Sequence, residues 1–272
     1  MVLMDQHALH GVEGIGPHLS VTRRTARQPR PLPPVLLLHG FGSSGRQNWV
    51  GTGWVRYLDD AGRTLIMVDL PGHGDSAEPV DAGDYAPSRM REDIVQSLVE
   101  TGIVPLSADD PTSGVDVIGY SLGARLAWEL GAARPDLVRR MVLGGPGTCD
   151  PLASFDLRAA ERQLAGGPPV DDPVTADLLH MAMSTPGTTL SALLTMVSAI
   201  RTEPFDPWRA LPGMPLLLVA GDQDGYATGI GELEARAPSG EVLLLPGRTH
   251  ANAVTARTFK DAASAFLSRG RD

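Results

Sequence analysis

Short apolar runs recur along the chain, and most of them end in glycine, serine or aspartate. An unbroken apolar run, unlike an alternating one, is typical of a parallel strand that is covered on both faces. Apolar residues at helical spacing lie between several of these runs, as in residues 90–101 and 124–133. This alternation predicts an α/β fold with a mostly parallel central sheet and helices on both faces. The predicted buried strands are residues 35–38, 63–68, 115–118, 216–220 and 242–245.

Two regions depart from this alternation of predicted strands and helices. Residues 7–24 contain glycines between short apolar stretches, which predicts a hairpin with residues 19–22 as its clearer strand. Between residues 144 and 211 the apolar runs stop. The pattern there predicts loops and short helices, the helices at residues 156–164, 174–183 and 188–200.

Composition narrows the classes of function. The 272 residues are 42% apolar, which suffices for one large domain or two small ones with a buried core. The net charge of −9 gives no electrostatic footprint for nucleic acid. We expect no membrane partner and a cytoplasmic location, because no apolar run reaches the length of a spanning helix and residues 1–20 lack the pattern of a secretory signal. The single cysteine, Cys149, fits a reducing compartment and is interpreted as a small apolar filler.

The candidate nucleophile is Ser121, in the stretch Gly119-Tyr120-Ser121-Leu122-Gly123. A predicted strand precedes this stretch and a predicted helix follows it, so the serine lies at a tight turn between them. Glycines on either side allow the two backbones to approach closely, and the strained turn presents the serine hydroxyl outward. An ordinary strand-to-helix turn can have the same sequence pattern, so the rest of the chain has to decide whether Ser121 is a nucleophile.

A glycine-rich loop, residues 39–45, follows the first buried strand. A phosphate-binding P-loop is disfavoured, because residues 46–47 are Arg-Gln instead of Lys followed by Ser or Thr. A dinucleotide-binding loop fits the spelling of residues 40–45, and Asp69 closes the next strand as that motif requires. Against it, residues 49–53 are expected to delay any helix. An oxyanion hole is the third use of the free backbone amides in this loop.

Three segments at strand ends, in this order, resemble the α/β-hydrolase superfamily: His39-Gly40-Phe41-Gly42, Asp69-Leu70-Pro71-Gly72-His73-Gly74-Asp75-Ser76 and Gly119-Tyr120-Ser121-Leu122-Gly123. The resemblance covers most of residues 34–267 and implies the α/β-hydrolase fold. It also implies an acid and then a histidine after the nucleophile. Asp224 is favoured as the acid over Asp222, and His250 matches the base. Thr249 departs from the glycine that the superfamily more often has before this histidine. His73, between two glycines, is interpreted as a structural turn residue.

The resemblance assigns each group a role. His250 would take the proton of Ser121, and Asp224 would fix the tautomer of the imidazole. The backbone N–H groups of Phe41 and Leu122 would hold the oxyanion. Gly40, Tyr120 and Arg125 are the remaining candidates for substrate contacts; for Tyr120 and Arg125, packing or pairing with a carboxylate is an equal alternative.

The resemblance also implies a core of residues 1–147 and 212–272 and a small helical cap at residues 148–211. Six apolar side chains could give the cap an inner face toward the site, although packing between the cap helices is the favoured interpretation. If the cap lines the pocket, the substrate is a small molecule with an apolar acyl or aryl part. The six are Met181, Met183, Leu190, Leu193, Leu194 and Met196.

The function implied first is a carboxylesterase-like serine hydrolase that cleaves a small ester, thioester or lactone without a metal or organic cofactor. Serine at the elbow argues against haloalkane dehalogenases and epoxide hydrolases, which carry aspartate there. Residues 119–125, which are the elbow followed by Ala124-Arg125, together with residues 69–74 are also similar to the menaquinone-pathway synthase that eliminates pyruvate. In that synthase an arginine at the position of Arg125 helps to bind a carboxylated substrate. Arg158 and Arg162 are candidates for its further arginines. A carbon–carbon bond hydrolase and a non-enzymatic ligand receptor remain as alternatives, and the oligomeric state is open.

Overall fold

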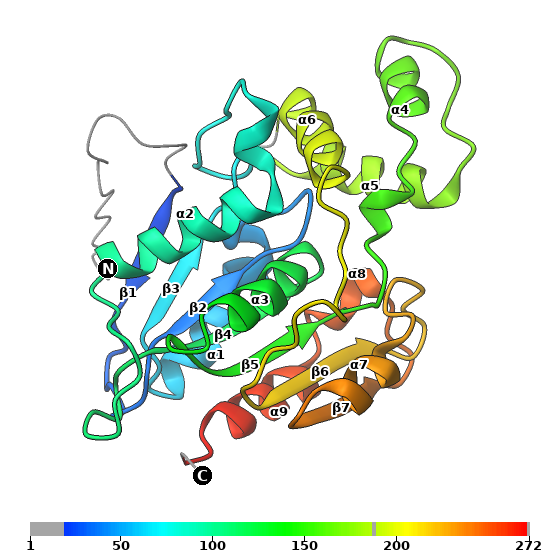
Figure 1. Ribbon diagram of the computed structural model, residues 1–272. Helices are drawn as coiled ribbons and strands as arrows, with labels where there is room; N and C mark the ends of the chain where they lie inside the picture. Colours follow the sequence, from blue (N-terminus) through cyan, green and yellow to red (C-terminus); the bar gives the residue numbers. More distant parts are fainter. Residues whose placement is uncertain (1–18, 187–188, 271–272) are drawn as a thin grey trace.

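The computed structural model describes residues 19–186 and 189–270, and its centre is a seven-stranded sheet in the order β1-β3-β2-β4-β5-β6-β7 (Figure 1). Only β1 runs antiparallel to its neighbour; the other pairs are parallel. The predicted α/β class with a mostly parallel sheet is therefore confirmed. The strands are β1 (Val21–Arg24), β2 (Val35–Leu38), β3 (Leu65–Val68), β4 (Val115–Tyr120), β5 (Val138–Gly144), β6 (Leu216–Gly221) and β7 (Gly240–Leu245).

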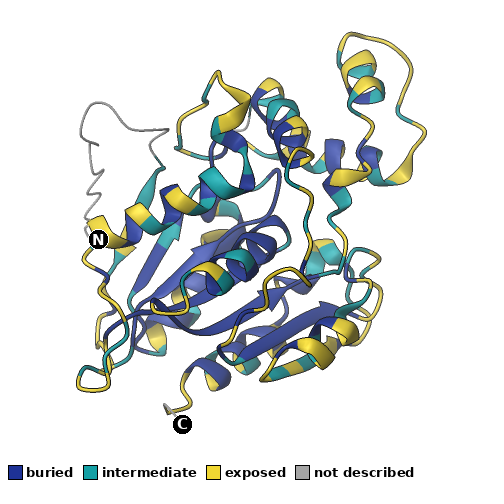
Figure 2. Cartoon of the chain, viewed as in Figure 1, coloured by how far each residue is buried: buried dark blue, intermediate teal, exposed yellow. Residues whose placement is uncertain are grey.

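Helices cover both faces of the sheet, because alternate residues of each strand point to opposite sides. On one face, Leu36 and Leu38 of β2 pack in a cluster with α2 and α3; on the other, Val35 and Leu37 pack with α1 and α9. Figure 2 shows the central strands, β2 to β6, as the most continuously buried part of the chain. The helices of this core are α1 (Trp54–Asp60), α2 (Pro87–Glu100), α3 (Leu122–Ala133), α7 (Ile230–Arg236), α8 (His250–Ala253) and α9 (Arg257–Leu267).

Three further helices lie together beyond one end of the sheet in Figure 1. They are α4 (Leu157–Leu164), α5 (Pro173–Ser184) and α6 (Leu190–Ile200), close to the bounds that the sequence predicts. α5 reaches the core: the Thr185 hydroxyl, just after it, donates to the carbonyl of Gly42. The division into a core and a cap at residues 148–211 stays a prediction, and these helices occupy the segment that it names.

The apolar side chains predicted for the inner face of this segment mostly belong to the main core cluster or pack against it. Leu193 and Met196 are fully buried in the main core cluster, and Met181 packs against it. Met183 instead is 54% exposed. Among the described pocket-lining residues, this set contributes none, so packing between helices is the interpretation that the structure supports.

The helix expected to be delayed beyond residue 53 begins earlier. A π-helical segment, η1, spans Arg46–Gly51 directly after the glycine-rich loop, so that expectation is wrong. The local reason is capping: the Ser44 hydroxyl accepts from the amide of Gln47 at 3.2 Å, and the Ser44 carbonyl accepts from the amide of Asn48 at 2.8 Å. Two 3₁₀ turns, η2 (Ala82–Tyr85) and η3 (Pro151–Ala153), complete the described elements.

Strand β5 is absent from the sequence prediction, and the predicted hairpin is only partly visible. β5 contains Arg139 and Arg140, which interrupt its apolar run, yet both are buried. The clearer strand of the hairpin corresponds to β1, which pairs with β3; residues 7–18 lie outside the described residues.

A buried ionic cluster explains how β5 accommodates an arginine. Asp116 of β4 is fully buried and accepts two hydrogen bonds from Arg139, at 2.9 Å from Nε and 2.6 Å from Nη2. Arg63, just before β3, also donates to this carboxylate, and burial lowers the pKa of its guanidinium. Both arginines donate to the carbonyl of Leu267 at the end of α9. One carboxylate therefore joins two strands, the chain before β3 and the C-terminal helix.

Two buried histidines join the glycine-rich loop to the loop after β3. The ring of His39 accepts from the amide of Leu70 at 2.9 Å (Nε2), and the ring of His73 accepts from the amide of Gly42 at 3.0 Å (Nε2). Each Nδ1 lies within 2.9 Å of a backbone carbonyl, so each ring is a neutral imidazole that donates from Nδ1. Burial lowers the pKa of His39 to about 4 and that of His73 to about 3. The interpretation of His73 as a structural residue fits these contacts.

Replacing Asp116 with asparagine should strongly destabilise the fold. The substitution keeps the shape but leaves the buried guanidinium groups of Arg63 and Arg139 without their counter-charge, which we expect to lower the free energy of unfolding by about 3–5 kcal/mol. Equilibrium urea unfolding measures the change. Asp109→Asn, at an exposed position, is the matched control and should stay within about 0.5 kcal/mol of wild type. Equal midpoints for both variants would contradict a structural role of the cluster.

Acid should destabilise the fold in part through His73. Below the ordinary histidine pKa of 6.5 the unfolded chain binds a proton at this residue, whereas the folded ring stays neutral down to about 3, so stability is lost as the pH falls through this window. Between about pH 7.5 and pH 5, this one histidine should cost about 2 kcal/mol. We expect His73→Gln, whose amide oxygen can still accept from Gly42, to show a correspondingly shallower pH dependence of unfolding. His180→Gln, at an exposed position, should retain the wild-type slope.

Candidate active site

Ser121 occupies the tight turn between β4 and α3 in a strained conformation, with φ 55° and ψ −117°. Among the described residues, it is the sole non-glycine position with a positive φ. Such strain is typical of functional sites, and it persists here because the surrounding backbones leave no alternative. A Cβ on Gly123 would lie 2.1 Å from the carbonyl oxygen of Leu38, and one on Gly119 would lie 2.3 Å from that of Gly123. Only glycine at these two positions permits the turn.

His250 is the first residue of α8, and its ring is held by Asp224 on the loop after β6. Nδ1 of His250 lies 2.9 Å from Oδ2 and 3.0 Å from Oδ1 of Asp224, whose side chain is fully buried. A carboxylate at Nδ1 favours the tautomer that leaves Nε2 free to accept a proton. Asp222, the competing candidate, is exposed and instead accepts from the amide of Gly247 at 2.8 Å. The structure thus brings Asp224, and not Asp222, to the histidine.

Two tyrosines flank the imidazole. Tyr120 lies behind it: the phenol donates to the carbonyl of His250, the rings are 5.4 Å apart, and burial raises the pKa of Tyr120. Tyr226 packs its edge against the other side at 4.9 Å and 80°, and its amide donates to Oδ1 of Asp224 at 3.0 Å. Tyr120 was a candidate for substrate contact, but it is 5% exposed and positions the histidine instead. The sequence does not predict a role for Tyr226, because a tyrosine two residues after an aspartate carries no recognisable signal.

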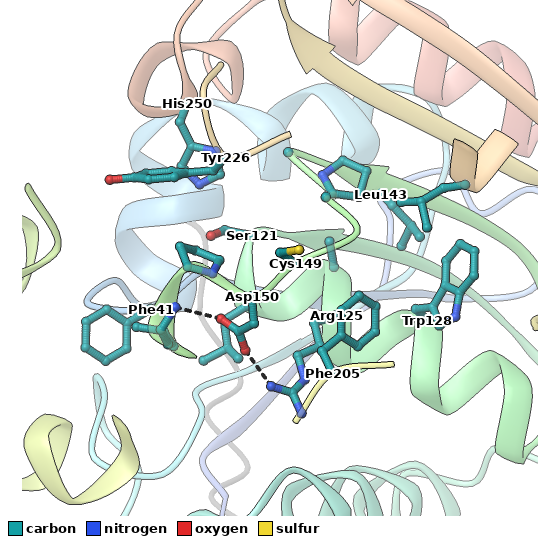
Figure 3. Close-up of a pocket in the computed structure, with 18 of the residues that line it drawn as sticks. Phe41, Ser121, Arg125, Trp128, Leu143, Cys149, Asp150, Phe205, Tyr226 and His250 are labelled. Atoms are coloured by element: carbon teal, nitrogen blue, oxygen red, sulfur yellow. Dashed lines mark hydrogen bonds and ion pairs between the residues drawn. The ribbon is translucent and has the colours of Figure 1, made fainter. Parts of the chain in front are cut away.

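Ser121 and His250 line the same pocket, which Figure 3 shows between the sheet edge and the cap segment. Among the described side chains, no hydrogen bond joins the serine hydroxyl to the imidazole. Such contacts are often long without substrate and shorten when it binds. The shared pocket therefore places nucleophile and base candidates together without fixing their final geometry.

The two residues predicted to supply the oxyanion donors, Phe41 and Leu122, both line this pocket. In the described part of the chain, neither backbone amide has a hydrogen-bond acceptor, whereas the amide of Gly42 is engaged by His73. Gly40 does not line the pocket; a Cβ there would lie 3.2 Å from Cβ of Ser121, so this glycine lets the loop approach the serine. The histidine pair thus fixes the loop while the amide of Phe41 stays available.

The pocket is mostly apolar and contains about 570 Å³ of empty space, including the part open to solvent. Cys149 lies on its wall and is exposed, so its interpretation as an apolar filler is wrong. The reason is its position on the loop that leaves β5 toward the cap segment, outside the packed core. The larger apolar side chains that line it are Phe41, Leu122, Trp128, Leu143, Leu152, Leu178, Phe205 and Leu233.

Arg125 lines the pocket, but the protein occupies its guanidinium. Nε donates to Glu129 at 3.0 Å, one Nη donates to the carboxylate of Asp150, and the other to the carbonyl of Glu203. The group also stacks over the ring of Phe205, 5.4 Å from its centroid. Asp150 and Glu203 stand at the two ends of the cap segment, so Arg125 joins both ends to helix α3. Arg125 is therefore paired with carboxylates, which is one of the two interpretations of this residue.

The dinucleotide alternative finds no support in these contacts. Asp69, which that motif needs for a ribose, accepts from the amides of Gly45 at 2.6 Å and Asp75 at 3.0 Å. It therefore braces the glycine-rich loop. Within residues 19–186 and 189–270 no group of histidine, cysteine and acidic side chains could hold a metal ion, and no helix has the length and apolar character needed to cross a membrane.

Curated relatives match part of the chain. The sn-1-specific diacylglycerol lipase ABHD11 of Mus musculus is 34% identical over 113 residues, and the esterase Rv0045c of Mycobacterium tuberculosis is 36% identical over 112 residues. Each match spans 41% of this chain and only 32% of the relative. The match thus spans about a third of the length of these relatives.

Similarity over nearly the whole chain is found with solved structures. MGS-M2, an alpha/beta hydrolase enzyme from a Medee basin deep-sea metagenome library, has a TM-score of 0.72 at 16% identity, covering 94% of this chain and 96% of that one. At this identity the likeness speaks for the fold. A model of the alpha/beta hydrolase family matches residues 35–262, which include every strand from β2 to β7 and all three residues Ser121, Asp224 and His250. The chain belongs to the alpha/beta hydrolase family.

Proposed function

We propose that the protein is a serine hydrolase that cleaves a small carboxylic ester, thioester or lactone. One observation carries the proposal: a serine in the strained turn after β4 shares a pocket with a histidine whose ring is held by a buried aspartate. Nucleophile, base and orienting acid are the three groups that acyl transfer through a covalent intermediate requires. The relatives whose names describe lipase and esterase activities support the same class of reaction.

In the proposed reaction, His250 removes the proton of the Ser121 hydroxyl as its oxygen attacks the carbonyl carbon. The imidazolium that forms is stabilised by Asp224, and it returns the proton to the leaving alcohol or thiol. Water then attacks the acyl-enzyme with His250 again as the base, which releases the acid and restores the serine. Tyr120 and Tyr226, which hold the imidazole and the carboxylate, preserve this alignment through both steps.

The oxyanion of each tetrahedral intermediate would lie between the amides of Phe41 and Leu122. Donors that are fixed before the reaction stabilise developing charge without reorganisation, and removing one typically costs about 3 kcal/mol of barrier. Here the positioning comes from His39 and His73, which fix the loop that carries Phe41. The apolar wall of the pocket supports a substrate with an apolar acyl or aryl part.

The alternatives have less support. The synthase interpretation needs Arg125 for a carboxylated substrate, and the guanidinium donates from Nε and both Nη atoms to protein groups. A carbon–carbon bond hydrolase would use the same three residues, and no contact in the pocket favours it over ester cleavage. A non-enzymatic receptor would have no need of the strained serine or of the buried acid behind the histidine.

Hydrolysis of p-nitrophenyl esters from acetate to decanoate tests the proposal. We expect the wild type to cleave the shorter or medium chains, with an optimum that reports the pocket's size. Ser121→Ala should fall to background, a loss of about 10⁴-fold or more in kcat, because the acyl-enzyme forms on the hydroxyl that this change removes. A variant that retains full activity would refute the proposal, and so would wild-type protein that neither cleaves an ester nor is labelled at Ser121 by a fluorophosphonate.

The choice of acid can be tested with a matched pair of variants. Asp224→Asn should lower kcat by about 10³–10⁴-fold, because an amide at Nδ1 favours the wrong tautomer of His250. Asp222→Asn, two residues earlier and exposed, should stay within about two-fold of wild type. Equal losses in both variants would show that the loop's fold, and not the charge of Asp224, is what matters. Circular dichroism of each variant checks that both are folded.

A further inference from the structure

We propose that the pocket selects acyl donors without a negative charge, and that Asp150 sets this selectivity by neutralising the cation beneath it. The inference rests on the proposed ester cleavage at Ser121. It names a substrate class for the site: esters whose acyl part is uncharged, as opposed to those that carry a carboxylate or phosphate on the acyl chain.

The argument begins with the charged side chains of the pocket. Apart from His250, its described lining residues include one basic and one acidic side chain, Arg125 and Asp150. They form an ion pair, with side chains only 6% and 8% exposed. In Figure 3 the carboxylate of Asp150 lies between Ser121 and the guanidinium of Arg125. A substrate approaching the serine therefore meets the carboxylate together with the arginine, and never the arginine alone.

The other neighbours add negative charge. Glu129 binds Nε of Arg125 from α3, and its second oxygen receives Arg91 at 3.2 Å. Asp224 lies behind His250. Both guanidinium groups are thus paired with carboxylates, Arg91 with Glu129 and Arg125 with Glu129 and Asp150. An anionic acyl chain would lose its hydration here and find no unoccupied guanidinium to replace it.

For an uncharged acyl chain, the same pocket offers favourable apolar contacts. The ring of Phe205 lies over Arg125 and shields it on the pocket side, and Trp128 and Leu178 line the same space. These side chains offer apolar contact without any polar group to desolvate. Discrimination therefore comes from a repulsive element, the carboxylate of Asp150, as well as from apolar attraction.

Asp150 suits this role because its position is fixed by two independent contacts. Its Oδ1 accepts from the amide of Leu152 at 2.9 Å, which caps η3, while Oδ2 binds Arg125. An asparagine can keep the first contact through its amide oxygen. Asp150→Asn therefore removes the charge with little change in the backbone, and it exposes the positive charge of Arg125 to the pocket.

The test compares two esters of equal chain length, p-nitrophenyl pentanoate and mono-p-nitrophenyl glutarate, which differ in a terminal methyl or carboxylate. We expect wild type to favour the pentanoate by about 100-fold or more in kcat/KM, and Asp150→Asn to reduce this ratio by about 10-fold or more. Asp156→Asn, at an exposed N-cap elsewhere in the cap segment, is the matched control and should keep the wild-type ratio. Should Asp150→Asn fail to fold, Arg125→Met should raise the ratio, since it leaves Asp150 unpaired.

Each outcome decides a different point. Wild type that prefers the glutarate ester overturns the inference and leaves ester cleavage intact, and an unchanged ratio in folded Asp150→Asn overturns the role of Asp150. If neither ester is cleaved, rates of Ser121 labelling by an alkyl fluorophosphonate and by its ω-carboxy analogue give the same comparison without turnover. Absence of both cleavage and labelling overturns the serine hydrolase proposal and this inference together.

Discussion

The close approach of two backbones at the turn after β4 is the constraint on which the rest of the site depends. Gly123 packs so tightly against the end of β2 that a Cβ would meet the carbonyl of Leu38, and this contact holds Ser121 at a positive φ. The same contact brings the loop after β2 beside the serine. The close packing of two neighbouring parallel strands therefore positions both the nucleophile and the glycine-rich loop that carries Phe41. His39 and His73 then fix the remainder of that loop.

Two clusters of buried charged side chains have different roles in this fold. Around Asp116 two arginines and one carboxylate join β4 and β5 to the last turn of α9, far from the pocket. Around Arg125 two carboxylates and a carbonyl accept from one guanidinium, and the cluster joins α3 to both ends of the cap segment. Burial makes each pairing obligatory, because an unpaired charge at either place would be costly. The first cluster fixes the sheet, and the second fixes the wall of the pocket.

The sequence predicts strands whose residues are mostly apolar, and β2 (Val35–Leu38) has the predicted bounds. It does not predict β5, because the pairing that makes Arg139 acceptable in a central strand involves Asp116, a residue distant in sequence. The elbow serine and the histidine follow from local pattern and chain order. Asp150 and Tyr226 do not, since their importance comes from what the fold places beside them. Local periodicity reports the burial of apolar residues, but it cannot report the partners of polar ones.

The same limit applies to reading a substrate from a motif. An arginine after the elbow is similar to one that binds a carboxylate in a synthase, yet a guanidinium can serve a substrate only if the protein leaves its donors free. In this chain Glu129, Asp150 and the carbonyl of Glu203 take all three nitrogens, and all three partners lie outside the motif. A residue of the same type at the same position thus has a different role, because its role is set by the charges that surround it. For a family in which one triad serves many reactions, the groups that pair the pocket's charges carry more information about the substrate than the triad does.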